Sequence, residues 1–194
     1  MGRKPLDKER NKNQSKTDLW LITLLAELQD QDLSKLSLNR LSQLMGRSKS
    51  TIYQYFSTKE EIIDRLIEIK LIEVKESIII DERMTVLETY EYFVMKVCQG
   101  LDGISIHFMN QLKVAFPIIW LKVEGFMNQV LIFFEGLYQR GMDEGIFMPY
   151  PISMLLAIDE FFMYQFMINP RRSIEPVETL VRYYMTLRLE GLQK

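Results

Sequence analysis

The chain has 194 residues, a formal net charge of −2 and a hydrophobic content of 47%, which is an ordinary composition for a globular protein. Its single cysteine excludes an internal disulfide, and one cysteine with one histidine is a poor stock for a four-ligand zinc site. Nothing approaches the run of about 20 apolar residues that spans a membrane. We therefore expect a cytoplasmic protein without a metal or another cofactor.

Charge is distributed unevenly along the chain. Residues 1–59 contain 11 Lys/Arg and 6 Asp/Glu, whereas residues 60–194 contain 13 Lys/Arg and 20 Asp/Glu. Such asymmetry indicates that the basic part meets a polyanion. We therefore predict a DNA-binding domain over residues 1–59 and a second domain over residues 60–194.

The N-terminal residues 1–16 are basic and have no apolar periodicity, so we expect a mobile arm. Such an arm either aids solubility or contacts phosphates or the minor groove. An apolar stripe that includes Leu19, Ile22 and Leu25 predicts the first helix over residues 17–29.

Two short helices follow. Ser37 can cap the first, and Gly46 can end it because glycine adopts left-handed backbone angles without a Cβ clash. Ser48 can cap the second, over residues 49–54, which would bury Ile52. This is the pattern of a helix-turn-helix. The side chains there that can bond phosphates or base edges are Ser48, Lys49, Ser50, Thr51, Tyr53, Gln54 and Tyr55.

The run GRSKSTIYQYFSTKEEI over residues 46–62 resembles the DNA-binding signature of TetR/AcrR-type bacterial transcriptional regulators. The specific resemblance covers residues 37–62, and elsewhere it is one of length and helical layout. It departs at Arg47, where the family usually has a small aliphatic residue. Either the Arg47 stem packs along the surface, or the turn is less well packed.

A long helix is predicted over residues 58–80, with Lys59 at its N-terminus, where backbone N–H groups favour a phosphate. Its 23 or so residues would span about 35 Å, enough to join a head to a separate body. Apolar periodicity and Gly/Pro breaks predict five further helices. These cover residues 85–101, 104–115, 118–142, 152–168 and 177–192.

Together these elements predict an all-α fold of about nine helices. A three-helix helix-turn-helix head is joined by the long fourth helix to a helical ligand-binding and dimerisation domain. The resemblance implies a homodimer through the last two helices, although their apolar residues could instead complete the core of one subunit. The interface candidates are Phe161, Phe162, Phe166, Val181, Tyr184 and Leu187.

Ten of the twelve methionines and most of the aromatic residues follow residue 83, a composition that suits an adaptable apolar pocket as well as a core. The resemblance implies a small-molecule effector site in this region. Glu124 beside aromatic rings would suit a cationic lipophile. The candidate ligand-binding residues are Phe93, His107, Gln111, Trp120, Glu124, Asn128 and Phe162.

The leading hypothesis is a dimeric, ligand-responsive regulator, a repressor, that binds a palindromic operator in double-stranded DNA and is released by an apolar effector. The expected DNA-binding residues are Ser37, Ser48, Lys49, Ser50, Thr51, Tyr53, Tyr55 and Lys59. A second hypothesis is a protein-interaction co-regulator on the same fold that does not depend on its own DNA reading. An enzyme is disfavoured, because the sequence has no pattern of a nucleophile, metal cluster or phosphate loop.

Overall fold

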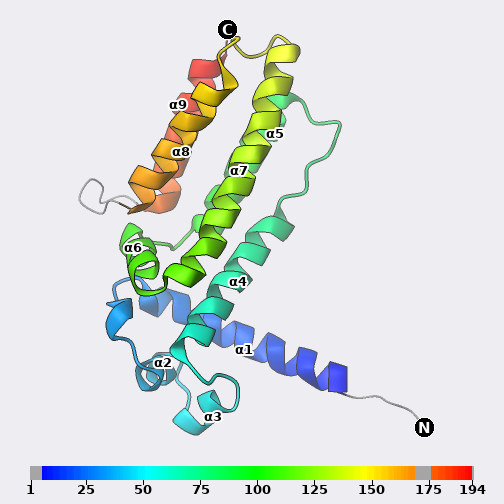
Figure 1. Ribbon diagram of the computed structural model, residues 1–194. Helices are drawn as coiled ribbons and strands as arrows, with labels where there is room; N and C mark the ends of the chain where they lie inside the picture. Colours follow the sequence, from blue (N-terminus) through cyan, green and yellow to red (C-terminus); the bar gives the residue numbers. More distant parts are fainter. Residues whose placement is uncertain (1–5, 169–175, 194) are drawn as a thin grey trace.

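The computed structural model describes residues 6–168 and 176–193, and within them the chain forms nine α-helices and no β-strand (Figure 1). The all-helical fold class predicted from the sequence is confirmed. The helices are α1 (Leu6–Leu28), α2 (Leu38–Leu44), α3 (Lys49–Tyr53), α4 (Lys59–Ser77), α5 (Val86–Leu101), α6 (Ile106–Ala115), α7 (Pro117–Asp143), α8 (Ile152–Ile168) and α9 (Val177–Leu192). A 3₁₀ helix, η1 (Leu33–Lys35), connects α1 to α2.

Helix α1 begins earlier than predicted. The expectation of a mobile arm was wrong for residues 6–16, which are helical, while residues 1–5 lie outside the described chain. Lys, Glu, Arg, Gln and Leu dominate this segment, and it contains no Gly or Pro. Intrinsic propensity of this kind favours a helix even where no apolar stripe is present.

The head consists of α1, α2 and α3, which lie at one end of the molecule (Figure 1). The turn between α2 and α3 depends on Gly46, whose φ of +62° lies in the left-handed region. Leu21, Leu41 and Ile52 have no exposed surface and form the centre of the head. The predicted helix-turn-helix is therefore built around buried apolar residues at the head end of the core.

Helix α4 joins the head to the body, as Figure 1 shows. It packs against α1 on the head side and against α5 and α7 on the body side. The Arg65 guanidinium fixes it to α1, donating to both Asp18 carboxylate oxygens at 3.1 and 2.9 Å. Residues 78–80, predicted to extend this helix, lie in a loop. There Tyr92 Oη donates to the Ser77 carbonyl at 3.2 Å and accepts from Ile79 N at 3.4 Å.

The body consists of α5 to α9, in which α9 packs on α5, α8 packs on α7, and α6 lies between them and the head (Figure 1). One continuous apolar core runs from the head through the body. Aromatic rings fill its centre: Phe134 lies 5.4 Å from Tyr90 and 5.6 Å from Tyr138 between ring centroids. The body is therefore stabilised mainly by contacts between helices distant in sequence.

A buried polar network ties α8 to α7 and α9. Asp159 has no exposed surface and accepts hydrogen bonds from Tyr138 Oη at 2.6 Å, from Tyr184 Oη and from Arg188 Nε at 3.1 Å. Burial raises the pKa of both tyrosines well above the ordinary value. The carboxylate is stabilised by these three donors, one of which is the Arg188 guanidinium, and they offset its loss of water.

Helix α7 meets the length and composition of a membrane span, although the sequence was expected to contain none. In the fold it packs against α4, α5, α6 and α8. A core helix passes the same test of length and composition, so this one helix is weak evidence for a membrane.

Candidate nucleic-acid interface and apolar cavity

The short helix α3 is held in place by its own cap and by one buried side. Ser48 Oγ accepts a hydrogen bond from Thr51 N at 3.1 Å, and it lies 2.9 Å from Ser50 Oγ. Ile52 and Phe56 anchor the segment in the head core. The cap and these anchors fix which side of α3 faces outward.

The outward side of α3 carries polar and aromatic groups. Lys49, Ser50, Tyr53 and Tyr55 are exposed, with Tyr53 at 57% the more exposed of the two tyrosines, and Thr51 is half-buried. No ion pair involves Lys49 among the described residues. This surface therefore offers a free ammonium group, hydroxyls and aromatic edges, the groups that bond phosphates and base edges.

Trp20 on α1 supports the outer edge of this surface. Tyr55 meets the Trp20 ring edge-on at 5.6 Å between centroids, and the Arg47 guanidinium lies 4.7 Å from the ring centroid. Of the two alternatives for Arg47, the structure shows the first, with the side chain lying along the surface. Its cation–π contact takes the place of the aliphatic packing that is usual in this turn.

The two residues expected at helix N-termini are already engaged within the protein. Ser37 Oγ accepts from Arg40 N at 3.1 Å as the cap of α2. Lys59 is half-buried, donates to the Ser34 carbonyl at 3.2 Å and lies over the Phe116 ring at 5.4 Å. The Lys59 ammonium group has three N–H donors, so this bond leaves donors for a phosphate, and its DNA role stays a prediction.

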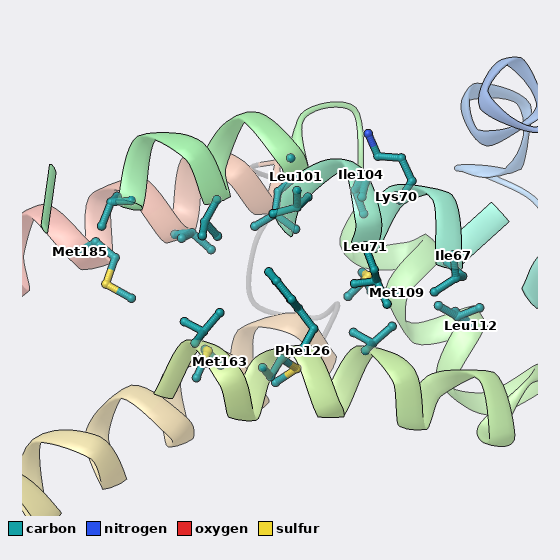
Figure 2. Close-up of a pocket in the computed structure, with 18 of the residues that line it drawn as sticks. Ile67, Lys70, Leu71, Leu101, Ile104, Met109, Leu112, Phe126, Met163 and Met185 are labelled. Atoms are coloured by element: carbon teal, nitrogen blue, oxygen red, sulfur yellow. The ribbon is translucent and has the colours of Figure 1, made fainter. Parts of the chain in front are cut away.

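An apolar cavity of about 90 Å³, measured as the space open to the centres of water-sized molecules, lies inside the body (Figure 2). Helices α4 to α9 all contribute to its wall, as does Leu25 of α1. The remaining lining residues are Ile67, Lys70, Leu71, Val74, Phe93, Val94, Val97, Gly100, Leu101, Ile104, Phe108, Met109, Leu112, Val123, Phe126, Met127, Val130, Phe134, Phe162, Met163, Val181 and Met185. Such a wall is typical of a site for a small, largely apolar molecule.

Two of the seven residues predicted to bind a ligand line this cavity, Phe93 and Phe162. Trp120 Nε1 instead donates to Glu124 Oε1 at 2.7 Å, and this pair lies outside the lining.

The other three predicted ligand residues also lie outside the lining. Gln111 Oε1 accepts from Leu33 N at 3.2 Å, which joins α6 to η1. His107 and Asn128 do not reach the cavity wall either, and His107 is exposed.

Sequence reasoning did not select Lys70, the one ionisable residue that the described part of the chain contributes to the cavity wall. Its position contained a usable signal. Residues three or four apart share a helix face, and Lys70 is spaced in this way from Ile67 and Val74, which also line the cavity.

Helix α6 has one side in the cavity and another on the head. Phe108, Met109 and Leu112 line the cavity. At the start of α6, Ser105 N donates to Gln29 Oε1 at 2.7 Å, and Ser105 Oγ donates to the Gln29 carbonyl at 3.1 Å. Both contacts reach the exit of α1, so a displacement of α6 would act directly on the head.

An apolar stripe runs along the outside of the last two helices. Met154, Ile158 and Phe161 of α8 are spaced by three or four residues and exposed, with Phe161 at 65%, and Leu187 of α9 is 68% exposed.

The other interface candidates predicted from the sequence lie elsewhere. Phe162 and Val181 are buried in the subunit, and Tyr184 bonds Asp159. The side chain of Phe166 lies outside the described residues.

The comparisons with known proteins agree with this geometry. Residues 23–66 match the family model described as bacterial regulatory proteins, tetR family. A Bacillus subtilis (strain 168) protein described as the uncharacterized HTH-type transcriptional regulator YvaF is 27% identical over 96 residues, 48% of this chain and 50% of that protein. The match thus spans about half the length of this curated relative.

Solved structures are similar over nearly the whole fold. A TetR-family transcriptional regulator from Marinobacter aquaeolei VT8 has a TM-score of 0.71 at 18% identity, over 91% of both chains. The ketosteroid transcriptional regulator KstR2 of Mycobacterium tuberculosis has a TM-score of 0.65 at 15% identity, over 92% of this chain and 95% of that one. These likenesses show the fold of tetR-family regulators, and within that fold residues 23–66 match the model of the tetR family of bacterial regulatory proteins.

Proposed function

We propose that the chain is a ligand-responsive, DNA-binding transcriptional regulator, a repressor, that binds a palindromic operator as a homodimer in the cytoplasm. The observation that carries this proposal is the outward side of α3, where Lys49, Ser50 and Tyr53 are exposed opposite the buried Ile52. A recognition helix needs one side anchored and the other free for the major groove.

The proposal assigns separate tasks to residues 1–59 and 60–194. The first part binds DNA, and its excess of 11 Lys/Arg over 6 Asp/Glu supports this role. The second binds the effector and the other subunit. The exposed stripe of Met154, Ile158 and Phe161, with Leu187, supports dimerisation through α8 and α9. A two-fold dimer presents two heads to two half-sites.

The proposed response to the effector runs through α6 and α4, which carry cavity residues and also contact the head. A ligand that fills the cavity displaces these helices and alters the spacing of the two heads. Only the difference in ligand affinity between the DNA-bound and released states can drive this shift. The α6–head contacts of Ser105 with Gln29 and of Gln111 with Leu33 support the route.

Binding to palindromes from the DNA that flanks the gene, measured by fluorescence anisotropy across a salt titration, tests the proposal. Lys49→Ala should weaken binding and reduce the salt slope by about one, and Tyr53→Ala should also change sequence preference. Lys35→Ala is the matched control, since Lys35 is exposed but pairs with Asp32 away from α3. Lack of salt-dependent DNA affinity would contradict the proposal and favour the co-regulator.

Subunit assembly is tested in parallel by light scattering coupled to size exclusion. Phe161→Asp should produce a monomer with weaker operator affinity. Ile132→Asp on α7 is a matched control, because Ile132 is 68% exposed and Phe161 65%. A dimer that survives Phe161→Asp and Leu187→Asp would overturn the α8–α9 interface.

A further inference from the structure

We propose that the cavity takes an elongated amphiphile with an uncharged apolar body and an anionic head, and that Lys70 binds this head. The inference rests on the ligand-binding half of the proposed function and names the chemical class of its ligand. Three features of the cavity carry it: the chemistry of its wall, the position of the Lys70 amine and the surroundings of that amine.

The wall selects an apolar body. Apart from Lys70, the lining consists of apolar side chains and Gly100. A polar group buried against such a wall without a partner loses its hydration and gains no hydrogen bond in return. On α7 the lining runs from Val123 to Phe134, about 16 Å along the helix axis at its rise per residue. An extended hydrocarbon body matches this length and chemistry.

The amine lies where a head group would lie. Figure 2 shows Lys70 at the edge of the cavity, with its nitrogen turned away from the apolar side chains in the middle. The Lys70 side chain is only 16% exposed, so most of it is covered by the wall, and its amine lies beside the exposed carboxylate of Glu73. A ligand could thus bury its body and keep its charge at the rim.

The amine retains capacity for a ligand. Lys70 Nζ donates a hydrogen bond to Glu73 Oε2 at 2.9 Å, and an ammonium group has three N–H donors. Glu73 is 58% exposed, so its carboxylate can turn toward water when another anion arrives. Charge-assisted bonds from a partly covered ammonium group are among the stronger hydrogen bonds.

The same surroundings disfavour the cationic lipophile expected from the sequence. Within the described residues no carboxylate lines the cavity, and Glu124 accepts from Trp120 outside it. A cationic head at the rim would meet the Lys70 ammonium as a like charge. The sign of the head group is therefore set by Lys70.

Isothermal titration of the full-length protein with dodecanoate, dodecyl phosphate, 1-dodecanol and dodecyltrimethylammonium tests this assignment. The two anions should bind at least about tenfold more tightly than the alcohol, as expected for a hydrogen bond to a charged group, and the cation most weakly. The relative affinities of dodecanoate and dodecyl phosphate distinguish a carboxylate head from a phosphate head.

Variants of the protein locate the anionic head group of the ligand. Lys70→Met should remove the advantage of the anions over the alcohol while leaving alcohol affinity within about twofold, because the apolar wall is retained. Glu73→Gln should tighten anion binding by removing a competing carboxylate. Lys96→Met is the control, since Lys96 lies over Tyr92, away from the cavity lining. Thermal unfolding of each variant checks that the fold is intact.

Three results overturn the assignment in distinguishable ways. Equal binding of alcohol and anions, unchanged in Lys70→Met, removes the role of Lys70 but leaves an apolar effector site in place. If Lys75→Met instead removed the tighter binding of the anions, the head group of the ligand would be assigned to Lys75, which lies over the lining residue Phe126. Absence of binding by all four probes would contradict the ligand-binding half of the proposed function itself, and the DNA assay reports on the other half independently.

Discussion

Helices α2, α3 and α4, in and next to the head, each begin at a hydroxyl side chain, Ser37, Ser48 and Thr58, that accepts a hydrogen bond from a backbone N–H three residues later. In the body, Thr85 and Ser105 cap α5 and α6 in the same way, but α7 and α9 begin at Phe116 and Pro176 with no side-chain cap. Pairs such as Tyr90 with Met185 join body helices that are far apart in sequence. The outward surface of α3 is thus set mainly by short-range bonds, and the cavity mainly by long-range packing. Substitutions can therefore alter one while sparing the other.

The largest effect is expected from Asp159→Ala in the body. It leaves the Arg188 guanidinium, whose side chain is 13% exposed, without its partner carboxylate, and breaking a buried pair from one side costs about 3–5 kcal/mol. Denaturant unfolding should show this loss. The control is Asp143→Asn, since Asp143 accepts from Gln139 in an exposed contact. A loss under about 1 kcal/mol, the net value of an ordinary hydrogen bond, would mean that the network contributes little to the body.

Two glycine-to-alanine substitutions test the packing beside the cavity. At Gly100 a new Cβ would lie 2.2 Å from Val74 Cγ2, whereas at Gly125 it would meet nothing within 4 Å. Gly100→Ala should force α4 and α5 apart and cost about 1–3 kcal/mol. Gly125→Ala should stabilise α7 by about 0.5–1 kcal/mol. Thermal unfolding should show a lower Tm for Gly100→Ala and a higher Tm for Gly125→Ala. A higher Tm for both variants would show that the contact between Gly100 and Val74 relaxes freely.

Ser48→Ala tests the head by itself. It removes the cap of α3, for which we expect a loss of about 1 kcal/mol and weaker operator binding, while affinity for a cavity ligand stays unchanged. The matched variant is Ser105→Ala, which removes the cap of α6 and its contact with Gln29. Amide hydrogen exchange in α3 reports the loss of the Ser48 cap, and ligand titration reports whether either variant changes the cavity. A parallel loss of ligand affinity in Ser48→Ala would contradict the independence of head and body.

The smallest effect concerns Cys98, which is 1% exposed in the body core. Burial raises its thiol pKa from 9.0 to about 11. The native state therefore keeps a proton that the unfolded chain releases first, so the contribution of Cys98 to stability is complete below pH 9 and is lost as pH rises toward 11. Thiol labelling near pH 8 should be slow in the folded protein and fast in denaturant. Fast labelling of the native state would indicate frequent opening of the body.

Much of the helical layout followed from the sequence because apolar spacing and Gly/Pro breaks are local signals. The α2–α3 turn was predicted because Gly46, Ser48 and the adjoining apolar residues lie within a few positions of one another. The start of α1 was not predicted, because helix propensity rather than an apolar stripe extends this helix to Leu6. The end of α4 was missed as well, where Tyr92 Oη bonds the backbone at Ser77 and Ile79.

The candidate ligand residues show where local signals stop being sufficient. An isolated polar residue on an apolar helix suggested a site at Gln111 and Glu124, yet each is satisfied by a partner outside the cavity. The spacing of Lys70 from Ile67 and Val74 was only a weak signal, because a lysine near acidic residues also fits a solvated face. Which side of a helix faces a cavity depends on its neighbours, and these neighbours come from several different helices.

The sequence by itself determined the resemblance to the tetR family, the helix-turn-helix and the outward residues of α3, because caps, a left-handed glycine and a three-to-four-residue apolar spacing act within one or two turns. Only the tertiary structure decided the cavity, the Lys70 amine at its rim and the buried Asp159 network. The physical reason is that burial and the pairing of buried polar groups arise between helices separated by tens of residues, where spacing along the chain carries no information about distance in space.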